Sequence, residues 1–124
     1  VTLVRVNLTS IDFATAFPAL DVLQLSNCSG MEEAFDRLPV DTQLSALSIR
    51  IEADSPPIHL PSFQLWLTKQ KRLDFLSLQG NLQLTALNLT ALSHLGSLNI
   101  DGVVSLESLS GLSFVPGLKV LQLR

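Results

Sequence analysis

The amino-acid sequence repeats one hexapeptide pattern, leucine-x-x-leucine-x-leucine, six times within 124 residues, with Ile or Val replacing Leu at some positions. Successive copies begin 19, 24, 29, 22 and 23 residues apart. A repeat of this length indicates one structural unit copied along the chain, and it constrains every other inference about the fold. The copies start at Val1, Leu20, Leu44, Leu73, Leu95 and Leu118 and read V-T-L-V-R-V, L-D-V-L-Q-L, L-S-A-L-S-I, L-D-F-L-S-L, L-G-S-L-N-I and L-K-V-L-Q-L.

Within each copy, apolar residues alternate with other residues, which is typical of an extended strand with one buried face. The intervals between copies are too long for hairpins and suit parallel strands joined by crossovers. One unit cannot bury its apolar face alone, whereas a stack of units can. The repeat therefore predicts about six parallel strands side by side, with the intervening segments returning on the other side.

The hexapeptide and its spacing resemble those of the leucine-rich repeat family, whose repeats are about 20–29 residues long. The resemblance covers essentially the whole chain. It implies an α/β solenoid with about six parallel strands on the concave face and short helices, 3₁₀ turns and loops on the convex face. The family motif continues with x-x-Asn/Cys-x-Leu, and only Cys28 and Asn81 match among the residues at that position, which are Thr9, Cys28, Glu52, Asn81 and Val103.

The chain is long enough for one domain with a real core, and we expect residues 1–124 to form a single leucine-rich repeat domain. Solenoids need polar or specialised end caps, and neither end of the sequence shows one. Three explanations are open: the chain is part of a longer array, partner chains replace the caps, or identical chains stack end to end. The last contact would not close on itself and would give a filament.

The return segments predict two helices. In residues 29–43, Ser29-Gly30-Met31-Glu32 fits the S-x-x-E capping box, and Ala34, Phe35 and Leu38 would face the core. A second, short helix is expected to begin near Ser62, because the apolar residues that follow have helical spacing and predict one buried face. Those residues are Phe63, Trp66 and Leu67.

Two segments have an ambiguous pattern. Residues 84–89 also fit the strand hexapeptide, but a strand there would leave too little chain for a crossover. We therefore expect short helical or irregular turns over residues 84–92. Leu106, Leu109 and Leu112 have a three-residue period and predict 3₁₀-like turns, while Gly102 suits a tight corner.

The sequence holds no arrangement that predicts catalysis or a bound cofactor. The two histidines, His59 and His94, lack partners at metal-ligand or catalytic spacing. His59 is expected in a loop, and both are expected at the surface or in a corner. No nucleotide-binding or nucleophile-elbow motif is present. Cys28 lies where the family places a buried residue that bonds neighbouring backbone, so we expect a structural role. We expect no enzyme activity, cofactor or metal.

The candidate binding surface is the strand face that the leucines leave exposed, which in the family commonly binds proteins. Three columns of side chains run along it. The central column is read as Arg5, Gln24, Ser48, Ser77, Asn99 and Gln122, the next as Asn7, Ser26, Arg50, Gln79, Asp101 and Arg124, and the preceding one as Leu3, Val22, Ala46, Phe75, Ser97 and Val120. The expected partner-binding residues are Arg5, Gln24, Arg50, Phe75, Gln79, Asn99, Asp101 and Gln122. The alternative is an ordinary solvated sheet face without a ligand.

Three asparagines, Asn7, Asn27 and Asn88, stand in N-x-Ser/Thr sequons. About one would be expected by chance, so the excess favours a secreted or cell-surface protein carrying N-linked glycans. The net charge of −3 and the scattered basic residues do not indicate a nucleic-acid surface. No apolar run is long enough for a membrane span. The leading hypothesis is a protein-recognition module, and the alternative is a self-assembling subunit joined through the uncapped ends.

Overall fold

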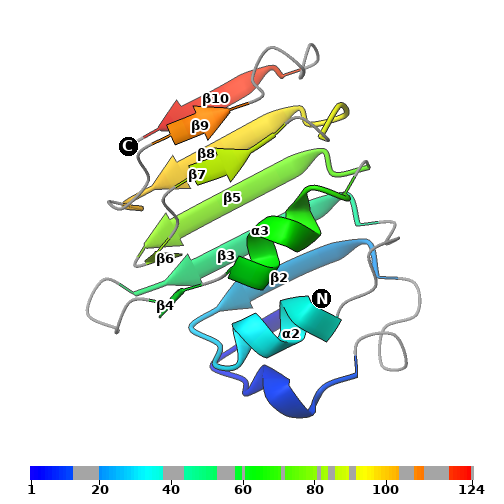
Figure 1. Cartoon of the computed structure of the whole chain (residues 1–124), viewed down its shortest axis with the longest axis vertical. Coiled ribbons are helices and arrows are strands. Elements are labelled where there is room, and N and C mark those ends of the chain that lie inside the picture. The colour runs from blue at the N-terminus through cyan, green and yellow to red at the C-terminus, as the bar shows by residue number, and fades with distance from the viewer. Residues whose placement is uncertain are drawn as a thin grey trace.

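The computed structural model describes residues 1–12, 20–37, 44–52, 58–59, 61–70, 72–80, 82–83, 86–89, 92–103, 108–110 and 118–123. The chain has an α/β fold with a sheet of six parallel strands in one layer and two helices and short strands in a second layer (Figure 1). The sequence also led to expectations for five residues that lie outside the described ranges, namely Leu38, Asn81, Leu106, Leu112 and Arg124.

The six strands of the main sheet stand side by side in chain order, and every neighbouring pair is parallel. This arrangement confirms the sheet expected from the hexapeptide. The strands are β1 (Thr2–Val4), β2 (Val22–Ser26), β3 (Ala46–Ile51), β5 (Phe75–Gly80), β8 (Ser97–Asp101) and β10 (Val120–Leu123).

The leucines form rows across the strands. Leu23, Leu47, Leu76 and Leu98 are successive partners in the register, and all four side chains are fully buried. A second buried row follows two residues later. Because each fully buried Leu or Ile contributes about 1.5–3 kcal/mol of hydrophobic stabilisation, these rows stabilise the contact between neighbouring strands. The second row is Leu25, Ile49, Leu78 and Ile100.

The first strand has a different register from the expected one. Thr2 pairs with Gln24 and Leu3 with Leu25, so the chain is displaced by three residues relative to the alignment of Val1 with Leu20. The first interval is therefore equivalent to 22 residues rather than 19, since Thr2 and Gln24 are 22 apart. Both alignments place apolar residues inside. The structural one is favoured because it also buries Leu8 completely, beyond the strand.

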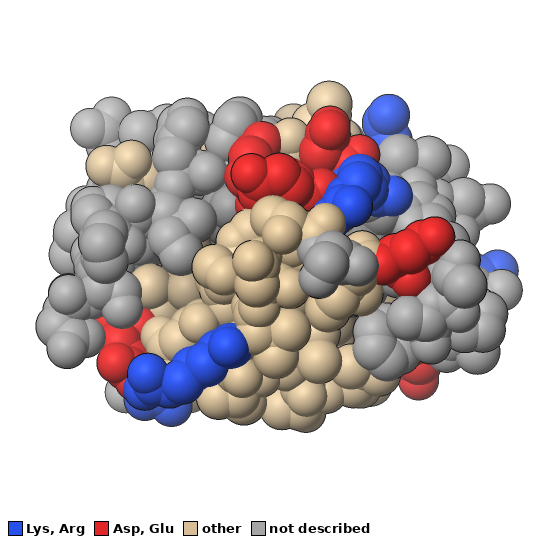
Figure 2. All heavy atoms as spheres, turned by 90° about the horizontal axis from the view of Figure 1, so that it is seen from below, with Lys and Arg blue, Asp and Glu red and all other residues tan. Residues whose placement is uncertain are grey.

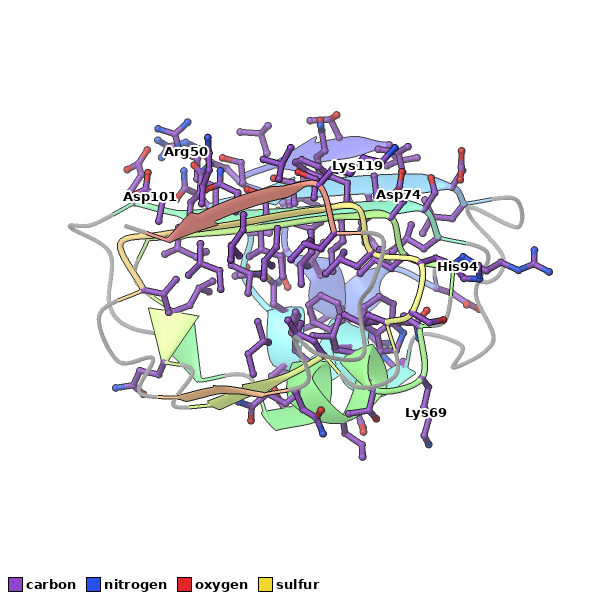
Figure 3. All side chains as sticks on the ribbon, turned by 90° about the horizontal axis from the view of Figure 1, so that it is seen from above. Arg50, Lys69, Asp74, His94, Asp101 and Lys119 are labelled. Carbon is purple, nitrogen blue, oxygen red and sulfur yellow. The ribbon has the colours of Figure 1, made fainter. Side chains whose placement is uncertain are left out.

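The second layer consists of the 3₁₀ helix η1 (Leu8–Ser10), the helices α2 (Met31–Arg37) and α3 (Pro61–Leu67), and two short parallel sheets. Figure 3 shows this layer across the core from the main sheet, with Lys69 on its outer side. The helix expected near Ser62 is confirmed, and its apolar face is buried as expected. The short sheets pair β4 (Ile58–His59) with β6 (Leu82–Gln83) and β7 (Ala86–Asn88) with β9 (Ser108–Ser110).

These short strands correct three expectations. Residues 86–88 form a strand instead of a helical or irregular turn, and residues 108–110 form its partner instead of a 3₁₀ turn. The objection that a strand there leaves no room for a crossover does not apply, because β7 lies in a separate sheet. His59 likewise stands in strand β4 rather than in a loop.

The helix α2 begins without the expected capping box. Ser29 pairs as a β-bridge with Asn7, and the first helical bond runs from the Ala34 amide to the carbonyl of Gly30, whose φ is +73°. The carboxylate of Glu32 accepts hydrogen bonds from the backbone amide of Ser62 at 3.1 and 3.3 Å. The acidic residue therefore caps the neighbouring helix α3 and joins the two helices.

Aromatic side chains fill the space between α2 and α3. The Phe35 ring meets Phe63 nearly edge to face at a centroid distance of 4.9 Å, and Trp66 lies 5.2 Å from Phe35. All three side chains are buried, at 3% exposure or less. This confirms the core positions expected for Phe35, Phe63 and Trp66.

Candidate functional site

The outward side of the main sheet, called the strand face below, carries the side chains that alternate with the buried leucines. The pairing register aligns them in three columns across β2, β3, β5, β8 and β10. The amino-end column contains Val22, Ala46, Phe75, Ser97 and Val120; the central column contains Gln24, Ser48, Ser77, Asn99 and Gln122; and the carboxyl-end column contains Ser26, Arg50, Gln79 and Asp101.

The amino-end column is apolar and accessible. Val22 and Phe75 are each 38% exposed, and Val120 is 47% exposed. Two small, partly buried residues, Ala46 and Ser97, lie between them. Three large apolar side chains on one edge of an otherwise polar face supply the kind of contact that an interface core requires.

The central column is polar, and the short serine side chains in its middle project little from the sheet. Ser77 is only 3% exposed, and its hydroxyl oxygen accepts a hydrogen bond from the Gln79 side-chain amide at 3.4 Å. At the sheet edge, the Thr2 hydroxyl donates to the side-chain oxygen of Gln24 at 2.8 Å. The hydroxyl and side-chain amide groups of this column can each donate and accept hydrogen bonds.

The carboxyl-end column carries opposite charges on strands that flank β5. Arg50 on β3 and Asp101 on β8 are both register partners of Gln79. Figure 3 shows Arg50 and Asp101 on the strand face at one end of the strands, with Asp74 and Lys119 at the other end. Asp74 and Lys119 are exposed and directly precede β5 and β10. The strand face therefore carries charged groups at both ends of its strands.

The register of β1 corrects three of the expected positions. Arg5 was expected in the central column and Asn7 in the carboxyl-end column, but both follow the end of β1, and Thr2 and Val4 take those positions. Leu3 was expected in the amino-end column, but it pairs with the buried Leu25 and packs against the core. The other expected binding residues, Gln24, Arg50, Phe75, Gln79, Asn99, Asp101 and Gln122, do lie on the strand face.

Arg5 belongs instead to a polar group beside the strand face. Its guanidinium donates to the Glu52 carboxylate at 3.1 Å, with the two side chains 70% and 43% exposed. The Asn27 side chain bonds Glu52 twice, donating from Nδ2 to the carboxylate at 3.1 Å and accepting from the Glu52 amide at 2.8 Å. Arg5 and Asn27 both have positive φ, 55° and 54°. The hexapeptide pattern does not predict a role for Glu52, because Glu52 comes after strand β3 and only the longer family motif includes its position.

The three sequon asparagines differ in their surroundings. Asn7 is exposed and caps η1, where its side-chain oxygen accepts hydrogen bonds from the amide and hydroxyl of Thr9. Asn88 is exposed on β7 in the second layer. Asn27 is partly buried against Glu52, so a glycan on its Nδ2 would have to fit beside the carboxylate that this atom contacts.

Cys28 has the structural position expected for it. The side chain is 2% exposed, and the thiol approaches the carbonyl oxygens of Leu3 at 3.3 Å and Ser26 at 3.7 Å. His94 is exposed, as expected. Within the described ranges, no group of three or more His, Cys, Asp or Glu side chains is placed to hold a metal ion. No described helix is long and apolar enough to cross a membrane.

A concave surface lies in the other layer, between α3 and β7. It is a shallow hollow of about 320 Å³ whose walls are mainly aliphatic. Ligand sites combine such walls with a few convergent polar groups, and this hollow offers only neutral amides and a hydroxyl at its margin. The strand face is the more complete candidate. The hollow is lined by Gln64, Leu65, Leu67, Thr68, Leu87 and Asn88.

Comparison of the chain with protein-family models, with curated proteins and with solved structures gave no match.

Proposed function

We propose that this chain is a leucine-rich repeat solenoid that binds a protein partner through its strand face and catalyses no reaction. The observation that carries the proposal is the exposure of Val22, Phe75 and Val120 in one row, beside polar side chains and the charges of Arg50 and Asp101. Protein interfaces combine an apolar centre with polar groups that fix orientation. The straight columns suit a partner that makes repeated contacts along several strands.

The size of the face sets the expected strength of binding. Five strands about 4.8 Å apart and three outward residues about 6.6 Å apart give a surface of about 400 Å². This is below the roughly 800 Å² per partner of a standard stable interface. Phe75 is the one aromatic anchor among the columns, and aromatic residues dominate binding energy at interfaces. We therefore expect weak binding by this face alone, strengthened where a partner also contacts the adjoining Arg5–Glu52 pair.

The proposed location is outside the cell, because three sequons occur in the sequence and two of them, Asn7 and Asn88, have exposed side chains. Neither exposed sequon lies on the strand face: Asn7 follows β1, and Asn88 is in the second layer. Glycans at these two positions would leave the columns of β2 to β10 accessible.

The test is a face-selective capture experiment. Tagged wild-type chain, Phe75→Ala, Arg50→Glu and a Lys69→Glu control are expressed in the same cells, and co-purifying proteins are quantified by mass spectrometry. Lys69 lies on the opposite layer in Figure 3, so its variant should retain the partner that the strand-face variants lose. Far-UV circular dichroism confirms that each variant is folded. A partner kept by both strand-face variants, or the absence of any protein, a second copy of this chain included, whose association depends on these residues would refute the proposal.

End-to-end assembly is a second candidate. The outer strands expose apolar side chains: Val4 on β1 is 54% exposed, and Leu121 on β10 is 45% exposed. The view onto the β1 end shows uncharged residues at its centre and charged groups around them (Figure 2). Strand β1 of one chain could extend the sheet beyond β10 of another, and the contact would repeat without closing. Rods that lengthen with concentration in electron microscopy would support it, and particles of one fixed size would exclude it.

A further inference from the structure

The strand face has a palindromic arrangement of side chains about β5. Strands β3 and β8 are its neighbours, and β2 and β10 lie one strand further out. In the carboxyl-end column, Arg50 stands one strand before Gln79 and Asp101 one strand after it. In the amino-end column, Val22 and Val120 stand two strands away from Phe75 on either side.

We infer that the partner of this face is a second copy of the same chain, in a face-to-face dimer whose two-fold axis runs parallel to the strands over β5. This inference names the partner class for the proposed function and rests on it. A two-fold axis makes an interface self-complementary, since residue i of one copy meets residue j of the other and j meets i. The palindromic arrangement makes the strand face self-complementary in this way, because side chains on one side of β5 have suitable counterparts on the other side.

The axis brings complementary groups together along each column. Arg50 of each copy faces Asp101 of the other, which gives two ion pairs. Val22 faces Val120, and Phe75 faces its own copy on the axis. In the central column, amide faces amide and hydroxyl faces amide or hydroxyl, and each of these groups can both donate and accept. The facing pairs there are Gln24 with Gln122, Ser48 with Asn99, and Ser77 with itself.

The rim at the amino ends of the strands follows the same rule. Asp21 precedes Val22 on β2, and Lys119 precedes Val120 on β10, so the axis brings them opposite each other. Both are exposed. Asp74 precedes Phe75 on the central strand and would meet its own copy. That contact is unfavourable but stands at the solvent edge, where salt screens it.

The other two-fold arrangement does not fit. An axis across the strands would place the amino-end column over the carboxyl-end column. Phe75 would then cover Gln79, and Arg50 would face Ala46 without a countercharge. Like the known aligned packing of sheets, the favoured arrangement allows a rotation of about 30° between the two sets of strands. Arg50 lies about 8 Å from the centre of the face, one strand across and one outward residue along, so this rotation displaces it by about 4 Å relative to the facing Asp101, which the length of Arg50 accommodates.

The expected dimer is weak, because about 400 Å² of each copy is covered, below the area of a standard interface. Sedimentation equilibrium of purified chain up to about 1 mM should therefore show a reversible monomer–dimer transition and no larger species. Arg50→Asp and Asp101→Arg should each raise the dimer dissociation constant at least about 10-fold, because each turns two attractive pairs into repulsive ones. The double variant with both charges exchanged restores both pairs and should dimerise within about threefold of wild type.

Two further variants test the position of the axis. Asp74→Asn removes the like-charge contact on the axis and should lower the dissociation constant. Gln79→Cys should join to its own copy with a short bis-maleimide, since facing sheets lie about 10 Å apart. Arg50→Cys should join more efficiently to an Asp101→Cys chain than to itself. Lys69→Cys, on the opposite layer, is the control and should remain unlinked.

A monomer at every concentration, or a charge exchange that fails to restore dimerisation in a folded variant, would overturn the inference. Growth beyond a dimer would also overturn it and point to end-to-end assembly. These results are separate from those of the capture experiment. A monomeric chain that still captures a different protein through Phe75 and Arg50 would preserve the proposed function, whereas a dimer that captures no other protein would limit that function to self-recognition.

Discussion

Of the four glycines that the structure describes, Gly80 tolerates an added side chain least. It ends strand β5 beside Ile51, with a φ of +94°. A Cβ atom built there would overlap the carbonyl oxygen of Ile51 on the neighbouring strand. We predict that Gly80→Ala destabilises the protein strongly and that Gly102→Ala destabilises it less. Gly102 has a similar φ, +74°, but its Cβ would meet no atom closer than 3.8 Å.

The two variants separate the cost of backbone conformation from the cost of close approach. A positive φ costs a residue with a Cβ about 1–2 kcal/mol, so Gly102→Ala should lose about that amount of the free energy of unfolding. Gly80→Ala adds the displacement of a backbone carbonyl, comparable to overpacking at about 1–3 kcal/mol, for a total of about 2–5 kcal/mol. Both substitutions reduce the entropy of the unfolded chain equally, so this contribution cancels in the comparison.

The measurement is urea unfolding followed by far-UV circular dichroism, with the slope m compared among wild type and both variants. An unchanged m shows that the midpoints report stability. The reasoning fails if the two variants lose equal stability, because the contact with Ile51 would then contribute nothing. It also fails if Gly80→Ala loses less than about 1 kcal/mol.

Other variants test the core and the polar group beside the strand face. Phe63→Ala should cost about 3–5 kcal/mol by calorimetry or urea unfolding because its ring is fully buried, whereas Leu65→Ala, at 66% exposure, should stay within about 0.5 kcal/mol; similar losses would contradict the assigned core. A double-mutant cycle on Asn27→Ala and Glu52→Ala should give a coupling of about 0.5–1.5 kcal/mol from their side-chain hydrogen bond, and additivity would exclude it. Glycopeptide mass spectrometry of native material should find Asn7 occupied more often than Asn27, and the reverse order would contradict the role of the Glu52 contact.

The parallel sheet could be predicted because the leucine pattern requires one buried face at every copy. The register of β1 could not be predicted, because the apolar residues of V-T-L-V-R-V are compatible both with the expected alignment of Val1 with Leu20 and with the observed pairing of Thr2 with Gln24. Deciding between them requires the long-range pairing of Asn7 with Ser29 and the burial of Leu8. The strand at 86–88 could not be predicted either, because sequence spacing does not reveal a second layer of short strands.

The candidate surface could be predicted for the strands with correct register. The alternation of side chains along each strand is enough to predict the outward positions of Gln24, Arg50, Phe75 and Asp101. Arg5 was placed wrongly because it depended on β1. The rim charges were overlooked because they stand just before the strands, where alternation does not predict exposure.

The position of the aromatic cluster has a practical consequence for folding experiments. Trp66 is the sole tryptophan, and its ring packs against Phe35 and Phe63 between α2 and α3. Intrinsic emission is therefore a local reporter for this part of the molecule, whereas the far-ultraviolet signal averages over every strand. If β8 and β10 separate before the helices do, the two optical transitions will not coincide, and the disagreement will locate the boundary between cooperative units.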